Sequence, residues 1–479
     1  MHISTLRTAA ALITLLGASA AAAQASPAPP VPVPTPAPLR AVAAPTQVPD
    51  DTTAALRAAA LADGTALSFL TDLTTQIGPR PAGTPAEARA RDWAVARLRS
   101  LGFQNVRIED FRMPVWERGA ESGAIVAPYR MPLALTALGG SAPTPAGGIE
   151  GAVVVFPDLA AFDAAPDSAV RGQIVYIGHQ MRRTQDGSSY GAFGPVRFSG
   201  PDRAAKRGVR AIVIRSIGTD QHRNPHTGQT NFSAGVTPIP AVAISNPDAD
   251  QLERLGTGTR VQLNLASRRL ENQPGGNVIA EMPGNDPSLP VVLAACHIDS
   301  WDLATGVMDD AAGCGIVTAA ARLAAQGQRP RRTIRVLLAG AEEVGVFGGR
   351  AYAEAHGNTP HAAALEADFG GDRVYKMTVS EPIAAHAGLM ARFRRGLLPL
   401  SVSVAAGDAS GGADVGATVA RGVPAIDLEQ DGTRYFDLHH TPDDTLDKVD
   451  PAQLSQAVAA WAVTLRLLAD APEAIGRGG

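Results

Sequence analysis

Five short segments with acidic or histidine side chains each follow an apolar run of this chain. They read CHIDSW (296–301), MDDAAG (308–313), AEEVG (341–345), EADFGG (366–371) and HHTPDD (439–444). In an open α/β sheet, ligands bind beyond the carboxyl ends of the strands, where side chains from distant parts of the chain converge. Two imidazoles with a surplus of carboxylates at such an edge favour metal binding. The pattern therefore predicts an α/β fold with a metal site at the ends of its strands.

Length and charge limit the partners of the chain. Its 479 residues suffice for two or three domains. Lys and Arg total 42 against 46 for Asp and Glu, which gives a formal net charge of -4. Because the sequence has no long basic run and no basic stripe with interleaved aromatic residues, we expect no nucleic-acid partner.

Residues 1–25 have the composition of a secretory signal peptide. Arg7 is followed by an apolar stretch, and Ala23-Gln24-Ala25 reads as a cleavage site. The apolar stretch is shorter than the roughly 20 residues that span a bilayer, so we expect no membrane span after cleavage. Residues 26–50 are rich in Pro and Ala, which is typical of an extended tether. We therefore predict an exported protein, periplasmic or secreted.

The pattern of elements changes twice after the tether. Strand-plus-helix units occupy residues 51–116 and 271–479, including a predicted helix over 451–468. Residues 117–270 instead hold short β-rich runs separated by Gly, Pro and Asp, with one helical piece at 202–208. We therefore predict an α/β domain, built from the two outer segments, that carries an inserted β-rich domain.

The two cysteines, Cys296 and Cys314, are too few for a disulfide framework. In an exported protein they can pair, but we expect one at a strand end and the other inside a helix. The sequence does not fix the geometry that a disulfide needs. Our interpretation is that both are buried free thiols.

His297 and Asp299 are two residues apart and lie on one face while a strand persists. Asp299 can therefore accept the second N–H of the imidazole and fix its tautomer. An isolated H-x-D pattern more often marks a histidine that is satisfied by a local hydrogen bond. The prediction of a site thus depends on all five segments together.

Adjacent carboxylates, Glu342 and Glu343, follow the apolar run TIRVLLAGA. Two neighbouring carboxylates in a semi-buried position repel each other unless a cation or a proton separates their roles. One can bind metal while the other transfers a proton. Asp309 and Asp310 precede a predicted helix, where one carboxylate would suffice as a cap.

The candidate ligands balance the charge of two divalent ions. Asp309, Glu343 and Asp368 supply three negative charges, whereas His297 and His440 are neutral. Two divalent ions with a bridging hydroxide would make this set nearly neutral. Imidazole and carboxylate ligands with an open position for water suit catalytic zinc, so we predict two zinc ions.

In this order the motifs resemble the co-catalytic zinc exopeptidase family, which includes bacterial secreted aminopeptidases and plasma glutamate carboxypeptidase. They are most similar to its carboxypeptidase Q branch, over most of residues 65–470. The similarity rests on the H-x-D-S-W and M-D-D segments and on IGPR (77–80), AEEVGVFGG (341–349), GADVG (412–416) and RYFDLHHTPDDT (434–445). The resemblance implies a three-layer α/β/α domain, with residues 117–270 as an inserted domain of the protease-associated type.

The resemblance also implies roles for the candidate residues. The zinc ligands are His297 and Asp368 for one ion, Glu343 and His440 for the other, and Asp309 as the bridge. Glu342 is the general base, which takes a proton from the attacking water and passes it to the leaving amine. Asp299 supports catalysis by orienting a ligand. The peptide bond between Asp309 and Asp310 is expected to be cis.

Other classes of protein need to be weighed. Residues 187–191 (GSSYG) fit the G-x-S-x-G pattern of serine hydrolases, but that motif needs a strand before it and a helix after it, and here the surroundings are loop-like. A glutaminyl cyclase of the same fold generally has Ser where this chain has Asp310, and it lacks a large insert. A non-catalytic binding module would have lost ligands, and none is missing here.

The substrate is less constrained than the site. The resemblance favours short peptides or dipeptides with free termini, with a general aminopeptidase as the alternative. Arg434 and Tyr435 precede His440 and could hold a substrate carboxylate, or they could be ordinary loop residues. Assembly into a homodimer is left open.

Overall fold

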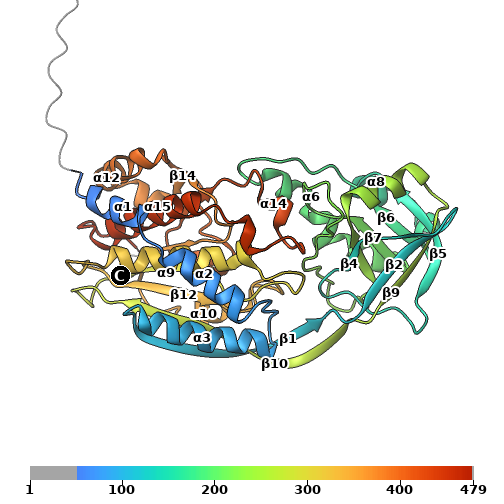
Figure 1. The fold of residues 1–479 in the computed structure, drawn as a ribbon, viewed down its shortest axis with the longest axis horizontal. Helices are drawn as coiled ribbons and strands as arrows, with labels where there is room; N and C mark the ends of the chain where they lie inside the picture. Colours follow the sequence, from blue (N-terminus) through green and yellow to red (C-terminus); the bar gives the residue numbers. More distant parts are fainter. Residues whose placement is uncertain (1–50, 477–479) are drawn as a thin grey trace, which may run out of the picture. The chain divides into compact units, whose positions relative to one another are not determined.

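The computed structural model describes residues 51–476, and Figure 1 shows how their helices and strands are arranged. The predicted signal peptide (1–25) and almost all of the predicted tether (26–50) lie outside the described residues. Within the described part of the chain, no helix combines the length and the apolar composition needed to cross a membrane.

A mixed five-stranded sheet forms the centre of the fold. The pairs β1–β10 and β10–β12 are antiparallel, whereas β12–β11 and β11–β13 are parallel. In spatial order its strands are β1 (Gln104–Glu117), β10 (Arg268–Met282), β12 (Ile334–Ala339), β11 (Val291–His297) and β13 (His361–Glu366). A parallel bridge between Ala364 and Ala425 continues this sheet into a smaller one. The smaller sheet has the order β15 (Ser403–Ala406), β14 (Val374–Val379) and β16 (Ile426–Gln430).

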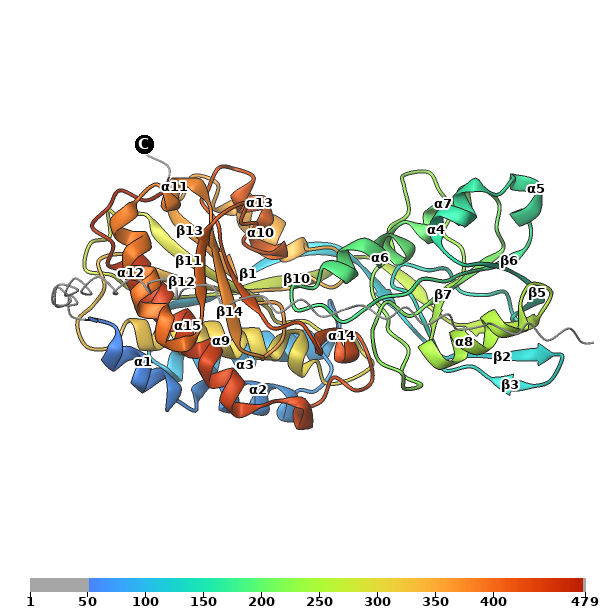
Figure 2. The ribbon, with the colours of Figure 1, turned by 90° about the horizontal axis from the view of Figure 1, so that it is seen from above.

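Helices cover both faces of the central sheet because its buried strands carry apolar side chains on both sides. In β12, Val336 belongs to one hydrophobic core and Leu337 to another. The first core contains residues of α2 (Thr65–Gln76), α3 (Pro85–Ser100), α9 (Ala312–Ala324) and α15 (Pro451–Ala469), and the second contains residues of α10 (Phe347–Ala355) and α13 (Ala413–Val419). Figure 2 shows these two groups on opposite sides of the strands. The three layers confirm the predicted α/β fold.

Capping residues set the starts of the helices that pack on this sheet. The Thr84 hydroxyl accepts the backbone N–H of Glu87 at 3.4 Å, and Pro85 occupies the first position of α3. Asp450 caps α15 in the same way, so the helix predicted over 451–468 is confirmed. The other α-helices of the outer segments are α1 (Ala54–Leu61), α11 (Glu381–Ala384), α12 (Ala387–Leu397) and α14 (Tyr435–Leu438). Three short helices of other types are η1 (Val307–Ala311), η2 (Leu398–Leu400) and η3 (Leu446–Lys448).

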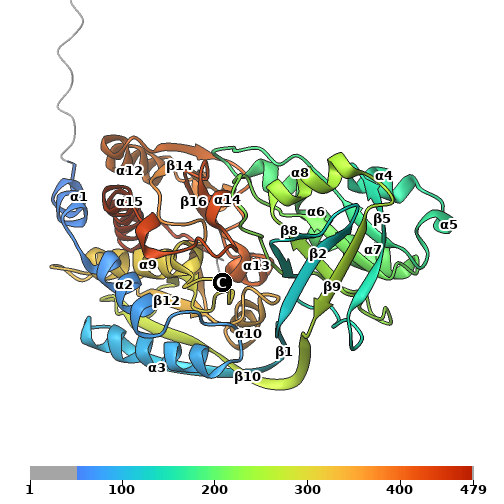
Figure 3. The ribbon, with the colours of Figure 1, turned by 45° about the vertical axis from the view of Figure 1, so that its right-hand side comes forward.

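Residues 118–267, which we call the middle segment, form a separate eight-stranded sheet. Its order is β3 (Met131–Pro132), β2 (Glu121–Ala127), β9 (Arg260–Leu265), β5 (Ile149–Phe156), β6 (Ile174–Ile177), β7 (Ala211–Arg215), β8 (Ala241–Ile244) and β4 (Leu135–Ala137). Two further hydrophobic cores are built from this segment. The middle segment follows β1 and precedes β10 in the chain (Figure 3). These two strands are paired with each other, and the last residue pair before the middle segment is Glu117 with Arg268.

The middle segment contains more helix than the sequence analysis predicted. The helix predicted at 202–208 is present as α7 (Gly200–Lys206). It is accompanied by α4 (Leu159–Ala164), α5 (Asp167–Val170), α6 (Ser188–Phe198) and α8 (Asn246–Leu255). The prediction of a single helix is therefore wrong. Helix α6 contains Gly191, Gly194 and Pro195, whose low helix propensity is outweighed by tertiary packing.

Candidate metal centre

Three parallel strands end side by side and deliver the first candidate ligands. β11 lies between β12 and β13, and its last residue is His297. Glu343 follows β12, and Asp368 follows β13. Because parallel strands end at the same edge of a sheet, three segments that are far apart in the sequence meet there. The structure therefore confirms the prediction that these segments meet at the carboxyl ends of the strands.

Asp309 lies at the centre of the cluster. Its Oδ1 atom is 3.1 Å from Nε2 of His297, and its Oδ2 atom is 3.1 Å from Nε2 of His440. Glu343 contacts the same His440 nitrogen at 3.0 Å, and Asp368 lies 3.5 Å from the His297 nitrogen. The five predicted ligands therefore converge, with one carboxylate between the two imidazoles.

The backbone around Asp309 is irregular. The peptide bond between Asp309 and Asp310 is cis, as expected. Asp310 accepts the N–H of Gly313 at 3.0 Å, near the start of α9, and also the N–H of His297 at 3.1 Å. One carboxylate thus holds the first turn of the helix against the end of β11, while the other is directed toward the imidazoles.

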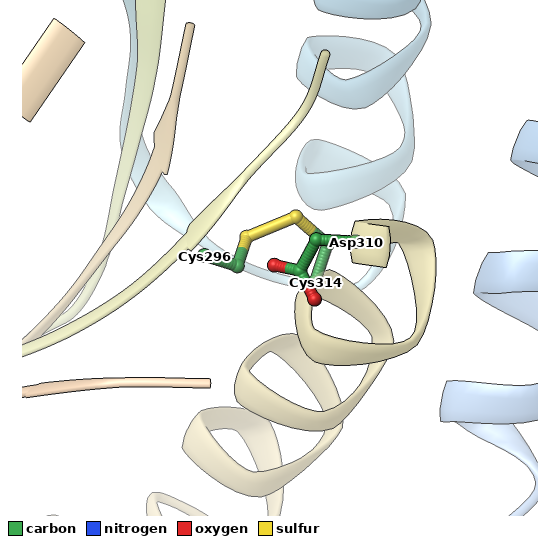
Figure 4. Close-up of side chains that lie close together, drawn as sticks. All are labelled: Cys296, Asp310 and Cys314. Atoms are coloured by element: carbon green, nitrogen blue, oxygen red, sulfur yellow. A yellow bond between two sulfur atoms is a disulfide. The ribbon is translucent and has the colours of Figure 1, made fainter. Parts of the chain in front are cut away.

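A disulfide links the same two elements. Cys296 of β11 and Cys314 of α9 are bonded, with their Cα atoms 5.1 Å apart, and Asp310 lies beside them (Figure 4). The prediction of free thiols is therefore wrong. The physical reason is that Asp310 draws the start of α9 close to the strand end, and the sequence alone does not show this approach.

His440 has an unusual backbone conformation, with a φ of 61° in the left-handed region. The middle segment supports it there, because Thr227 donates its N–H to the His440 carbonyl at 3.0 Å. The Thr227 carbonyl lies 3.3 Å from Nδ1 of His440 and can accept its proton. This contact leaves Nε2 free to face Asp309 and Glu343. The neighbouring His439 stacks on the ring, with centroids 3.5 Å apart.

The position of Asp299 differs in detail from the prediction. The atom nearest to Nδ1 of His297 is the backbone carbonyl oxygen of Asp299 at 3.1 Å, whereas its carboxylate lies at 3.7 Å. The carboxylate instead accepts the N–H groups of Glu342 and Glu343 at 3.1 and 3.3 Å. The strand ends at His297. Side chains two residues apart share a face only within a strand, so the side chains of His297 and Asp299 need not point the same way. Asp299 nevertheless ties the histidine segment to the glutamate pair.

Charge in the cluster calls for a cation. Burial, with Asp309 close by, raises the pKa of Glu343 to about 7. Burial also raises the pKa of Glu342 well above its ordinary value, and the Asp368 and Glu343 carboxylates add to this shift. For His440, burial opposes protonation, but the Glu343 carboxylate raises the pKa to about 9. Raised pKa values of carboxyl groups beside an imidazole whose pKa is also raised show a deficit of positive charge, which protons or metal ions can supply.

The donor set also fits zinc. Asp309 Oδ2 and Glu343 Oε1 are buried and take part in no hydrogen bond within the described residues. Ligand atoms of His297, Asp309 and Glu343 lie within 4.8 Å of one another, as do those of Asp309, His439 and His440. Buried carboxylate oxygens without donors, next to imidazole nitrogens, match the mixed N/O ligands of catalytic zinc sites.

A cavity of about 360 Å³ opens onto this cluster. Its walls include Glu342, Glu343, Asp309, Asp368 and His440. The middle segment contributes further lining residues, which are Tyr190, Arg197, Phe198, Gln229 and Asn231. The site is thus lined by residues from both parts of the chain.

Two residues proposed to hold a substrate carboxylate have different surroundings. The Arg434 guanidinium binds the Asp372 carboxylate at 2.5 and 2.7 Å and donates to the Lys448 carbonyl, so its charge is already paired. Tyr435 does line the cavity, where it packs against Phe369 with centroids 4.8 Å apart. Of the two alternatives left open for Arg434, these contacts favour an ordinary structural residue.

The serine-hydrolase pattern at 187–191 lacks the required geometry. Ser189 lies in the first turn of α6, and ten residues separate that helix from β6 (Ile174–Ile177). The hydroxyl of Ser189 accepts the N–H of Arg182 at 2.9 Å. The sequence analysis did not predict helix α6. A nucleophile elbow also needs a strand directly before the motif, and no strand adjoins residues 187–191.

Several supporting residues were not assigned roles from the sequence. Arg80, from the IGPR motif, is fully buried and donates to the carbonyls of Ile298, Thr305 and Gly306. It joins the chain after His297 to the chain before Asp309. The IGPR motif was the available signal for Arg80. The cavity residues of the middle segment had no such signal.

Comparison with known proteins agrees with this geometry. Residues 277–465 match Peptidase family M28. Carboxypeptidase Q of Bos taurus is 33% identical over 419 residues, which cover 85% of this chain and 85% of that protein. A solved structure described as a peptidase M28 precursor from Shewanella amazonensis SB2B shares 41% identity with a TM-score of 0.85, and the match covers 88% of this chain and 96% of that chain.

A more distant solved structure shares the fold alone. BSAP, a zinc aminopeptidase from Bacillus subtilis, has a TM-score of 0.61 at 20% identity, over 84% of this chain and 93% of that chain. The extent of the carboxypeptidase Q match confirms the family resemblance and the prediction of a zinc-dependent peptidase. The chain belongs to peptidase family M28.

Proposed function

We propose that this protein is an exported di-zinc exopeptidase, similar to carboxypeptidase Q, that hydrolyses the peptide bonds of short peptides or dipeptides. The observation that carries the proposal is the position of Asp309, whose two oxygens each lie 3.1 Å from an imidazole nitrogen, one of His297 and one of His440. A carboxylate between two imidazoles is suited to bridging two metal ions.

In this proposal each predicted ligand keeps its role. Zinc at one position would be held by His297 and Asp368, zinc at the other by Glu343 and His440, and Asp309 would bridge them. Bound zinc supplies Lewis acidity toward the peptide carbonyl and toward the attacking water. Asp299 positions both halves of the site, because it contacts His297 through its carbonyl and the glutamate pair through its carboxylate.

Glu342 is the proposed general base. Its carboxylate lines the cavity beside the ligand cluster, and burial raises its pKa. A raised pKa lets the group accept a proton from water and return it to the leaving amine near neutral pH. The carboxylate must lie within hydrogen-bonding reach of the water, so its length matters as much as its charge.

The boundaries of the domains are part of the proposal. Residues 51–116 and 271–479 would form the catalytic domain, and residues 117–270 a protease-associated-like insert. The separate sheet and separate cores of the middle segment support this division. The contacts of Thr227 with His440 give the insert a part in the site as well.

The function is tested with the purified full chain in two steps. Elemental analysis should find close to two zinc ions per chain, and a chelator should remove both the zinc and the hydrolysis of dipeptides. Three substrates then define the terminus: a dipeptide, the same dipeptide amidated at its carboxyl end, and the same dipeptide acetylated at its amino end. Cleavage that tolerates the amide but not the acetyl group would favour the general aminopeptidase. Full hydrolysis without zinc would refute the metal mechanism.

Export is tested on the natural protein. If residues 1–25 are a signal peptide, protein recovered outside the cytoplasm begins near Ser26. Amino-terminal sequencing of that protein decides the question, because a mature chain that still carries Met1 contradicts cleavage.

A further inference from the structure

A buried arginine from the middle segment lines the candidate active site without an anionic partner. Arg197, near the end of α6, is 2% exposed and forms part of the cavity wall. Its Nη1 donates to the Thr227 carbonyl at 3.2 Å, and its Nη2 donates to the Tyr190 hydroxyl. Its Nε is buried and has no hydrogen-bond partner within the described residues. None of these contacts is a carboxylate.

A buried guanidinium without an anionic partner lowers the stability of a protein unless a bound ligand pairs with its charge. A buried charge is normally paired, because removing it from water costs several kcal/mol. Other buried arginines of this chain show alternatives: Arg91 pairs with Glu87 at 2.5 Å, and Arg80 is surrounded by carbonyl groups. Arg197 has two neutral oxygen acceptors and lies beside the His440 ring nitrogen Nδ1, and it retains unused donors. An anion that enters the cavity would complete the pairing of this charge.

The guanidinium is also held in a fixed orientation. Its central carbon lies 4.5 Å from the centre of the Phe198 ring and 5.4 Å from that of Tyr190. Aromatic rings beside a guanidinium hold it by cation–π attraction. The Tyr190 hydroxyl takes one of the two Nη2 hydrogens, so the second Nη2 hydrogen is left to bond a carboxylate that enters the cavity.

The distance from Arg197 to the cluster limits where that carboxylate can lie on a substrate. Nη1 is 3.4 Å from Nδ1 of His440, and the other nitrogen of that ring faces Asp309 and Glu343. The guanidinium is thus one imidazole ring away from the proposed metal ligands. Consecutive residues of a peptide are about 3.8 Å apart, so an anchor this close matches the residue next to the scissile bond.

We propose that Arg197 binds the terminal α-carboxylate of the residue that is released, and that it thereby selects substrates with a single residue beyond the cleaved bond. This inference rests on the proposed exopeptidase function and assigns its terminal specificity to a residue of the middle segment. Arg434 is unsuited to this role because Asp372 neutralises it. Arg350, which also lines the cavity, is exposed, so water already solvates its charge.

The test compares alanyl-leucine with alanyl-leucine amide, which differ only in the terminal carboxylate. The zinc-loaded full chain should cleave the acid with a kcat/KM about 10²-fold above that of the amide, the range expected when one partner of a buried charge pair is lost. Arg197→Met should remove this preference, mainly by raising KM for the acid. Arg197→Lys, which keeps a cation but loses the planar fork, should retain part of it.

Controls separate the carboxylate role from general damage. Arg203→Met removes a cation of α7 that pairs with Asp163, away from the cavity, and should leave the preference unchanged. Zinc content and the thermal midpoint are measured for every variant. Calorimetry of alanyl-leucine binding to Glu342→Gln, with and without Arg197→Met, reports the same contact without turnover and should show weaker binding when Arg197 is replaced.

Three results would overturn the inference. The first is a wild-type enzyme that cleaves both peptides equally well. The second is an Arg197→Met variant, zinc-loaded and folded, that loses activity on both peptides to the same extent, since Arg197 would then act on the reacting group. The third is a preference that is lost in Arg350→Met but kept in Arg197→Met. Absence of any peptide hydrolysis by the zinc-loaded wild type would instead refute the proposed function itself.

Discussion

A carboxylate oxygen of Asp444 lies 2.6 Å from the backbone nitrogen of Met308. The same buried side chain accepts the N–H groups of Val307 and Asp309 at 3.1 and 3.2 Å. Asp444 follows His440 by four residues, so the loop that carries one proposed zinc ligand fixes the backbone of the bridging one. The two halves of the cluster are thereby connected without any metal.

Asp444→Asn should therefore lower zinc affinity. The amide cannot accept three N–H groups as the carboxylate does, so the segment around Asp309 loses its support, and we expect zinc affinity to fall about 10–100-fold. Competition with a chromophoric chelator measures this. Asp443→Asn is the matched control, because that side chain is partly exposed and pairs with Lys448. Equal zinc affinity in both variants would show that Asp444 does not position the bridge.

The adjacent glutamates should separate into a base and a ligand. Glu342→Gln keeps its shape but cannot accept a proton, so kcat should fall by roughly 10²–10⁴-fold while zinc content and substrate binding are retained. Glu343→Gln should instead weaken one zinc site. Zinc content and kcat are measured for both, with thermal midpoints in excess zinc as the control for folding. Loss of zinc in Glu342→Gln, with full zinc in Glu343→Gln, would mean that the roles are reversed.

The disulfide should contribute to stability. It closes a loop with a sequence separation of 18, for which loop entropy gives about 3 kcal/mol. Replacing Cys296 and Cys314 together with Ala should lower the free energy of unfolding by about this amount, as measured in urea. A thiol assay on the denatured, unreduced protein should find no free thiol, and two free thiols would contradict the pairing.

His361 should make stability depend on pH. It opens β13, is 3% exposed, and lies with Nε2 2.8 Å from the Tyr352 hydroxyl. Burial lowers its pKa from 6.5 to about 4. Between pH 4 and pH 6.5, His361 therefore binds a proton in the unfolded chain but not in the folded protein. The free energy of unfolding should therefore fall as the pH drops from 6.5 to 4, by up to about 3 kcal/mol from this group.

Urea unfolding across this pH range tests the assignment to His361. In His361→Gln the loss of stability on acidification should be smaller than in the wild type, whereas the exposed His222→Gln should leave it as it is. The same pH slope in all three proteins would show that this imidazole contributes nothing to it.

The sequence was sufficient to predict which ligand segments meet. His297, Glu343 and Asp368 could be grouped because each follows an apolar strand, and parallel strands end at one edge. Asp309 and His440 lie outside the strands, and their positions depend on Asp444 and Thr227. The contact between Thr227 and His440 spans 213 residues of sequence, so no local pattern could indicate it.

Other differences from prediction have local causes. Helix α8 could have been predicted, because Ser245 caps it through the N–H of Asp248 and Pro247 lies in its first turn. Helix α6 could not, since its glycines and proline disfavour a helix. Arg434 was considered because it stands near a ligand in the sequence, and only the fold shows that Asp372 already pairs with its guanidinium.

The way in which the middle segment joins the central sheet has a consequence for protein engineering. Glu117 and Arg268 face each other at the end of the antiparallel pair β1–β10, so a tight turn could connect them directly. Such a shortened chain would keep the sheet and all five proposed zinc ligands. It would lose the Thr227 carbonyl that orients His440 and the guanidinium of Arg197. A miniature of this protein would thus show how far zinc loading and the choice of substrate each depend on the middle segment.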